Sequence, residues 1–249
     1  MQTFLSQLAQ RLSEKYKDDL SKLCIILPNR RAKLFFKTQL SQLNTKPIWA
    51  PDIYSIEDWL TELSGLQACD NLNLTFRFYK VYKEIEGNQA QEFDEFVKWA
   101  QVLLHDFNEI DSYLVDTQKL FNTISEAHAM EVWNVDGTAP TEFQKNYLKF
   151  WKQLGLYYTA FKEFILKENL AYQGLIFRHC SDDILSLLEK NESNGQWKKL
   201  VFAGFNALSE AEEKIIRTLL LEGKAEIFWD ADDYYLNNPA QEAGKFLRK

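Results

Sequence analysis

The sequence predicts an α/β fold, in which a parallel sheet and its helices are interrupted by a large all-helical insertion. Short apolar runs typical of buried parallel strands occur at residues 23–27, 200–205 and 225–229. Recognisable helix starts follow the first two runs. Between these runs, residues 72–188 show helical periodicity and no convincing strand. This order of elements predicts one sheet whose strands are joined by parallel connections.

The first part of the chain predicts a helix, a strand and a second helix. Residues 4–17 carry apolar side chains at helical spacing. Pro28 ends the apolar run 23–27, and Asn29 suits the N-cap of the helix that follows. We expect that helix to bury one side, which holds Ala32, Phe35 or Phe36, Gln39 or Leu40, and Leu43.

An extended segment and a short helix follow. Two prolines disfavour helical geometry in the residues before them, so we expect residues 47–54 to be extended. Ser55, with Asp58 at the third helical position, is a variant of the capping box and predicts the start of a helix. That helix is expected to end at Gly65.

The middle of the chain predicts a helical subdomain. Residues 84–126 contain ten acids and two bases, which is typical of a solvated helical surface. A stripe of aromatic residues further on is far more often core than a ligand site. This stripe consists of Phe143, Tyr147, Phe150, Trp151, Tyr157, Tyr158, Phe161 and Phe164. We expect residues 72–194 to form the insertion, and residues 1–71 and 195–249 to form the α/β core.

The last part of the chain predicts the return to the sheet. Ser209 and Glu212 after the run 200–205 form a capping box, which predicts a helix from Glu210 to Leu221. Gly223 suits the end of that helix, and the run 225–229 predicts a third strand.

Composition narrows the functional class. With 249 residues, 46% of them hydrophobic, the chain can bury a sizeable core, and wholesale disorder is excluded. Cys24, Cys69 and Cys180 are scattered without a CxxC pair, which favours a reduced, cytoplasmic setting. We found no signal peptide and no apolar run of transmembrane length, so we expect no membrane association.

The charge is unevenly distributed. The net charge of −7 argues against a protein covered in nucleic-acid-binding surface. Residues 21–51, however, contain six bases and no acid, so this segment carries +6 and the remainder −13. A local basic patch on an acidic body is therefore expected.

Two cations stand at an unfavourable place within this segment. Arg30 and Arg31 fall in the first turn of the predicted helix, where the helix dipole disfavours positive charge. Either they pair with carboxylates elsewhere in the fold, or they meet an anion such as a phosphate together with the free N–H groups of the helix start. The sequence leaves both possibilities open.

Other candidate sites are weaker. A carboxylate cluster follows the third strand, but the remaining ligands of a calcium loop are missing, which favours capping and turn roles over a metal. This cluster consists of Asp230, Asp232 and Asp233. The three histidines lie far apart without zinc-ligand spacing, and no G-x-S-x-G nucleophile elbow is present.

Taken in order, the motifs resemble a known family. They are Ile26-Leu27-Pro28-Asn29-Arg30-Arg31-Ala32, then Trp59, then the insertion, then Ala203-Gly204-Phe205-Asn206-Ala207-Leu208-Ser209, then Phe228-Trp229-Asp230. This order resembles the N-terminal region of AddB-type subunits of AddAB/RecBCD-like helicase–nucleases, which belong among PD-(D/E)XK nuclease family proteins. The resemblance covers nearly the whole chain.

The resemblance implies a UvrD-like, P-loop-NTPase-like core of the helicase 1A type with a 1B-like insertion. The segment 23–40 would match motif Ia, which touches the backbone of single-stranded DNA. The strand 200–205 would match the strand that carries the Walker B acids, and the strand ending at Asp230 would match the one before motif III. An AddA-type helicase subunit is the implied protein partner.

The chain departs from the family pattern where catalysis would require a match. It contains no G-x-x-x-x-G-K-[ST] run to hold nucleotide phosphates. Gly204-Phe205-Asn206 stands where the Walker B carboxylates are expected. The family's nuclease signature lies in a C-terminal region that this sequence does not include. We therefore expect no ATP hydrolysis, no DNA cleavage and no cofactor in this chain, while the activity of a longer protein stays open.

The leading hypothesis is an inactive helicase-like domain that binds single-stranded DNA. Trp49 and Tyr54 would stack on bases, worth about 1–3 kcal/mol each, or lie buried under the sheet edge. The predicted DNA-binding residues are Asn29, Arg30, Arg31, Lys33, Lys37, Trp49 and Tyr54. One alternative is a structural module that docks a motor subunit through its acidic insertion. A less favoured alternative is a metal-dependent enzyme that uses the carboxylate cluster.

Overall fold

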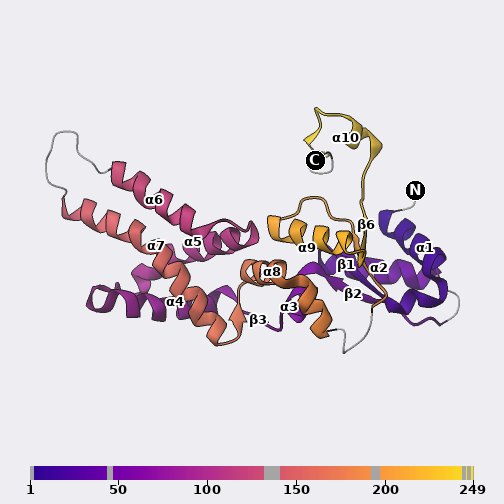
Figure 1. Cartoon of the computed structure of the whole chain (residues 1–249), viewed down its shortest axis with the longest axis horizontal. Helices are drawn as coiled ribbons and strands as arrows, with labels where there is room; N and C mark the ends of the chain where they lie inside the picture. The colour runs from indigo at the N-terminus through magenta and orange to yellow at the C-terminus, as the bar shows by residue number, and fades with distance from the viewer. Residues whose placement is uncertain are drawn as a thin grey trace. The chain divides into compact units, whose positions relative to one another are not determined.

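The computed structural model describes residues 3–43, 47–131, 141–191, 197–242, 245 and 248. The chain divides into two compact units (Figure 1). The first, the sheet unit, comprises Met1–Gly65 and His179–Lys249. The second, the helical unit, comprises Leu66–Arg178. The predicted α/β class with an inserted helical segment is therefore confirmed.

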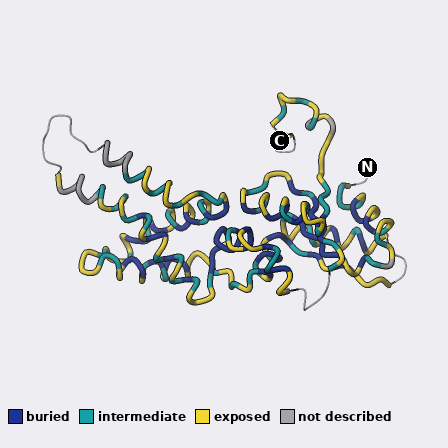
Figure 2. The backbone as a smooth tube through the Cα atoms, in the orientation of Figure 1, coloured by how far each residue is buried: buried dark blue, intermediate teal, exposed yellow. Residues whose placement is uncertain are grey.

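A four-stranded parallel sheet forms the centre of the sheet unit. Its order is β2 (Asp52–Ser55), β1 (Leu23–Leu27), β5 (Lys199–Ala203) and β6 (Ala225–Phe228). In the register, Ile25 of β1 lies opposite Ile53 on one side and Val201 on the other. Every residue of β1 is buried, as Figure 2 shows for the centre of this unit. The continuous apolar run 23–27 thus has the burial on both faces that it predicts.

The sheet unit also contains helices. They are α1 (Phe4–Tyr16), the 3-10 turn η1 (Lys17–Lys22), α2 (Arg30–Leu43), α3 (Ile56–Ser64), α9 (Glu210–Leu221) and α10 (Asp233–Asn237). Three of the helix ends are capped by the residues that the sequence predicts. Ser209 and Glu212 form the predicted capping box, and Ser55 Oγ accepts a hydrogen bond from the Asp58 N–H at 3.2 Å. Gly65 ends α3 in the left-handed conformation that glycine adopts most readily.

The extended geometry predicted for residues 47–54 is present at Asp52–Ser55, which pairs with β1 as a strand. One expectation for this unit needs correction. In α2, Phe36 and Leu40 are buried against the core, whereas Leu43 is 43% exposed. Leu43 is the last residue of α2, where the helix runs past the apolar surface that it covers.

The helical unit is built from helices and one very small sheet. Its helices are α4 (Asn71–Glu86), the 3-10 turn η2 (Gly87–Gln89), α5 (Phe93–Ser112), α6 (Thr117–Glu131), α7 (Glu142–Lys167) and the first part of α8 (Gln173–Asn191). The sheet pairs β3 (Gln67–Ala68) in parallel with β4 (Leu170–Ala171). The expectation of no strand between residues 72 and 188 is therefore wrong at β4, which is too short to leave a periodic pattern.

The boundary between the units differs from the expected one at residue 194. Residues of α8 from 179 onwards belong to the sheet unit. Cys180 and Ile184 are buried, and Cys180 Sγ lies 3.5 Å from the carbonyl oxygen of Leu60 in α3. This packing assigns the second half of α8 to the sheet unit. The expected boundary itself lies outside the described residues.

Aromatic side chains form the core of the helical unit. Phe78 of α4 contacts Phe96 and Phe107 of α5 and Phe161 of α7, with ring centroids 5.1–5.8 Å apart. All four rings are fully buried. The core role predicted for the aromatic stripe is confirmed for Tyr157, Tyr158 and Phe161, which are buried.

Within the described residues, no helix combines the length and the apolar character that crossing a membrane requires.

Candidate nucleic-acid interface

The candidate site lies at the turn between β1 and α2, where the central strand leaves the core. Asn29 begins this turn and caps α2, because its Oδ1 accepts a hydrogen bond from the Ala32 N–H at 2.9 Å. The predicted cap is therefore confirmed. Since Asn29 uses its side-chain oxygen inside the protein, it positions the helix start rather than offering that oxygen to a ligand.

Arg30 has a carboxylate partner. Its Nη2 lies 2.7 Å from Oδ1 of Asp58, and its Nε contacts both carboxylate oxygens at 3.1 and 3.3 Å. This hydrogen bond from Arg30 lowers the pKa of Asp58, with a smaller contribution from Ser55. Arg30 thus joins the start of α2 to the start of α3, as the first of the two alternatives for these arginines expects.

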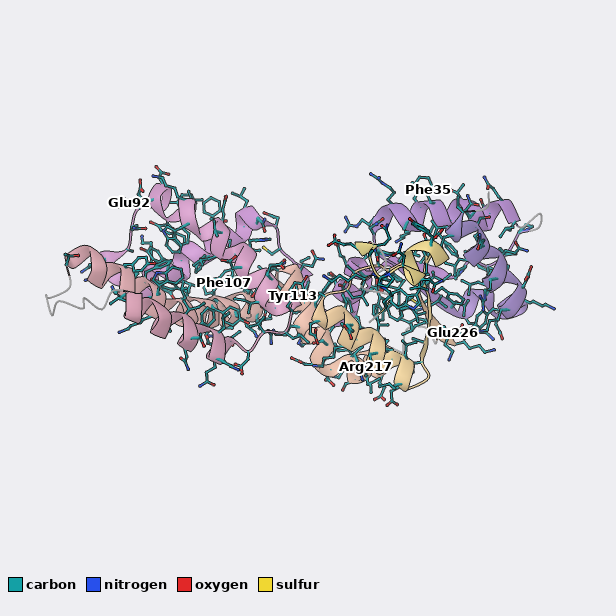
Figure 3. The ribbon with its side chains drawn as sticks, turned by 90° about the horizontal axis from the view of Figure 1, so that it is seen from above. Phe35, Glu92, Phe107, Tyr113, Arg217 and Glu226 are labelled. Atoms are coloured by element: carbon teal, nitrogen blue, oxygen red, sulfur yellow. The ribbon has the colours of Figure 1, made fainter. Side chains whose placement is uncertain are left out.

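Arg31 and Lys37 differ from Arg30. Both are exposed, and within the described residues neither of them has a carboxylate partner. Between them lie two exposed apolar side chains, Leu34 and Phe35, at 65% and 55% exposure. We name Arg31, Leu34, Phe35 and Lys37 the outer surface of α2. Figure 3 shows Phe35 on the outside of this helix.

Lys33 and Tyr54 form a contact with each other. The Lys33 ammonium lies 5.4 Å from the centroid of the Tyr54 ring, a cation–π geometry. The Tyr54 phenol donates a hydrogen bond to Glu62 at 3.3 Å, and its ring forms a T-shaped contact with Trp197, with centroids 6.3 Å apart. Tyr54 is therefore half-buried and engaged within the sheet unit. Stacking on a base would require it to leave these partners.

Trp49 has the opposite environment. It is 88% exposed, the highest exposure among the large hydrophobic side chains of the described residues. Burial under the sheet edge, the alternative left open by the sequence, is therefore wrong for this residue. An exposed indole in the segment after a basic helix is suited to stacking.

The protonation of Tyr54 makes the stability of the sheet unit sensitive to alkaline pH. Burial, with Glu62 and Asp52 nearby, raises the pKa of Tyr54 to about 12, and burial raises the pKa of Cys180 to about 12. In unfolded chains the pKa of a tyrosine is about 10 and that of a cysteine about 8.5. The folded state therefore holds both protons more tightly, and the resulting stability is present below about pH 8.5 and lost as the pH rises through about 12.

We therefore expect the free energy of unfolding, measured by urea denaturation, to fall between about pH 8.5 and pH 12. Tyr54→Phe removes the phenol and keeps the ring, so its decline should be shallower than that of the wild type. Identical declines in the two proteins would contradict a role for Tyr54 in this pH dependence.

The remaining strand ends carry little chemistry. Gly204 after β5 has a φ of +74°, and a Cβ at this position would lie 3.2 Å from the Phe4 ring. After β6, Asp232 caps α10 by accepting from the Tyr234 N–H at 2.8 Å, so its predicted capping role is confirmed. The side chain of Asp233 lies outside the described residues. In the part of the chain that the structure describes, no three His, Cys, Asp or Glu side chains converge as metal ligands would.

The sequence did not single out Leu34 and Phe35 as site residues. It left open whether Phe35 or Phe36 faces the core, and the structure buries Phe36 completely. A signal was present: Phe36 and Leu40 are four residues apart and define the buried stripe, which turns Phe35 outward.

Comparisons with known proteins add no assignment. No protein-family model matches the sequence, and no curated protein matches it significantly.

Proposed function

We propose that this chain is a catalytically inactive helicase-like domain of a DNA recombination and repair helicase–nuclease, and that it binds single-stranded DNA through the outer surface of α2. The observation that carries the proposal is that unpaired cations and exposed apolar side chains occur together on that surface. Arg31 and Lys37 have no carboxylate partner within the described residues, and the exposed side chains of Leu34 and Phe35 lie one turn after Arg31 on the same helix.

This combination suits a single strand better than a duplex. Cations attract the phosphates, and exposed aromatic rings stack on unpaired bases without requiring a particular sequence. Trp49 provides a second exposed ring in the segment that follows α2. The excess of bases in residues 21–51 supports attraction to the strand, although Arg30 and Lys22 are partly neutralised by Asp58 and Asp19.

The layout of the chain supports the helicase-like part of the proposal. All four strands of the main sheet are parallel, and the helical unit is inserted between β2 and β5. The absence of a Walker A sequence supports an inactive motor, since no Lys and Gly-rich loop is available to hold nucleotide phosphates. Binding single-stranded DNA requires neither the Walker A lysine nor the Gly-rich loop.

A second candidate function is docking to a motor subunit of the AddA type. The exposed apolar side chains of Leu34 and Phe35 favour it, because they also suit a protein partner. In that case binding would depend on the apolar side chains and only weakly on salt, whereas DNA binding depends strongly on both charge and salt.

Fluorescence anisotropy with a labelled single-stranded oligonucleotide across a salt series tests the proposal. We expect Arg31→Ala/Lys37→Ala to weaken binding and to reduce the slope of log K against log salt by about 1.4, or about 0.7 for each lost phosphate contact. Trp49→Ala should weaken binding with little change in slope, because stacking releases no counterion.

Arg217→Ala is the matched control. Arg217 is an exposed arginine of the same unit but lies on α9, away from Phe35 (Figure 3). We expect it to bind like the wild type. Equal losses in Arg217→Ala and in the double variant would refute binding through α2. No binding at low salt would refute DNA binding by this chain and would favour docking to a protein.

A further inference from the structure

The helical unit contains a pocket of about 740 Å³, which is lined in part by residues of the aromatic stripe. This volume falls within the range of small-molecule sites, about 300–1,000 Å³. The end of α4, the turn η2, α5 and α7 form its walls. Its aromatic lining consists of Tyr82, Trp99, Tyr147, Phe150, Trp151 and Tyr157.

Most neighbouring rings of the lining meet at steep angles, although Trp99 and Tyr157 are inclined to each other by only 30°. Trp99 and Phe150 have centroids 5.4 Å apart and an interplanar angle of 83°. Phe150 and Trp151 meet at 79°, and Tyr147 and Trp151 at 71°. Holding a flat ligand such as a nucleobase between two rings would require parallel faces. Ring faces turned in several directions suit a compact cation, which is attracted to the negative face of each ring.

A buried carboxylate completes the pocket. The side chain of Glu86 is 7% exposed and accepts hydrogen bonds from the Tyr157 phenol at 2.6 Å and the Lys149 ammonium at 2.9 Å. Burial acts to raise the pKa of Glu86, but the bonds from Tyr157 and Lys149 outweigh it and hold the pKa below its usual value. Glu86 is therefore negatively charged at neutral pH.

Lys149 is the cation that now accompanies this carboxylate. Its side chain is 44% exposed and also donates to Gln89 at 2.6 Å. A lysine side chain is long and flexible, and an ammonium with access to water gives up its partner at modest cost. Glu86 has no such freedom, because it is buried on α4.

We propose that this pocket binds an alkylated ammonium group, with Glu86 as its counter-ion, the rings of Trp99 and Phe150 among its walls, and Lys149 as an internal competitor. Alkylated ammonium groups are weakly hydrated, so transferring one into an aromatic pocket costs little desolvation. They need no hydrogen-bond acceptors along the walls, six of whose eleven residues are aromatic. The proposal is independent of the binding of DNA.

The first test compares a cation with its neutral isostere. The full chain is titrated with choline and with 3,3-dimethylbutanol, followed by tryptophan fluorescence and calorimetry, with sodium chloride at equal ionic strength as the baseline. We expect saturable binding of choline at least about tenfold tighter than that of the alcohol. Equal affinities would overturn the proposal, because they would indicate binding by apolar contact alone.

The second test uses the two halves of the ion pair. Glu86→Gln should weaken choline binding by about tenfold, and Lys149→Met should strengthen it several-fold by removing the competitor. Lys152→Met, an exposed lysine of the same helix outside the pocket lining, is the matched control and should bind like the wild type. An unchanged or weaker affinity in Lys149→Met would overturn the proposal, even if Glu86→Gln failed to fold.

The ligand could be a free small molecule or a methylated side chain of a protein. A peptide containing trimethyllysine is compared with its unmodified form and with choline. Tighter binding of the methylated peptide than of choline would assign the site to a protein ligand, and equal binding would assign it to the free cation. Either outcome supports the site, whereas a peptide that binds equally with and without methylation would contradict it.

Discussion

Replacing Asp111 with alanine is expected to lower the free energy of unfolding of the helical unit by about 3–5 kcal/mol. Asp111 is completely buried at the end of α5. Its carboxylate accepts hydrogen bonds from the phenols of Tyr158, at 2.6 Å, and of Tyr172, and it pairs with Arg178 at 2.5 Å. Removing the carboxylate leaves the mostly buried Arg178 charge without its counter-ion, which is far more costly than losing a surface ion pair.

Urea denaturation followed by circular dichroism measures this loss, with separate transitions fitted if the two units unfold independently. Asp106→Ala provides the matched control, because Asp106 is exposed on the same helix. We expect it to change stability by less than about 0.5 kcal/mol. A loss of similar size in both variants would contradict the role of the buried network. It would mean that removing any negative charge from α5 lowers the stability by the same amount.

The strands and helix ends of the sheet unit could be predicted because their signals are local. The run Leu23–Leu27 contains only apolar residues and forms the fully buried β1. Ser209 and Glu212 are three residues apart, so the capping box can be recognised without knowledge of the fold. Pairing is a different matter. The short strand β2 and the pair β3–β4 exist because of partners distant in sequence, which periodicity does not show.

The buried carboxylates of the helical unit could not be predicted from the composition of the segment that contains them. Residues 84–126 are rich in acids and predict a solvated surface, yet the side chains of Glu86 and Asp111 are buried. Their partners come from other elements, Tyr157 and Arg178 among them. A count of charges within one window cannot reveal such partners, and single buried carboxylates are rare enough that the average favours exposure.

The candidate site likewise contains one feature that the sequence predicts and one that depends on a partner distant in sequence. The capping role of Asn29 was predictable, because the cap and the N–H that it accepts are three residues apart. The partner of Arg30 was not, because Asp58 lies on another helix that only the fold brings close. The outcome leaves Arg31 and Lys37, rather than the pair Arg30 and Arg31, as the cations available to a ligand.

Gly174→Ala is the second substitution with a large expected effect, a loss of about 3 kcal/mol in the free energy of unfolding of the helical unit. At this position the start of α8 approaches α5 closely. The Gly174 N–H donates to Oδ1 of Asn108 at 2.7 Å. A Cβ would lie 2.1 Å from the backbone carbonyl oxygen of Asn108 and 2.8 Å from Oγ of Ser112. A carbonyl within a helix cannot move aside alone, so the two helices would have to separate.

Gly155→Ala is the matched control for this substitution. Gly155 lies inside α7, and a Cβ there would meet only the side chain of Phe121, at 3.3 Å. The tight contact is offset by the gain in helix propensity from glycine to alanine, about 1 kcal/mol, so we expect little net change. Urea denaturation of both variants decides the matter. If Gly174→Ala were no less stable than Gly155→Ala, the close approach of α8 to α5 would be wrong, because no relaxation of a side chain relieves a contact with backbone.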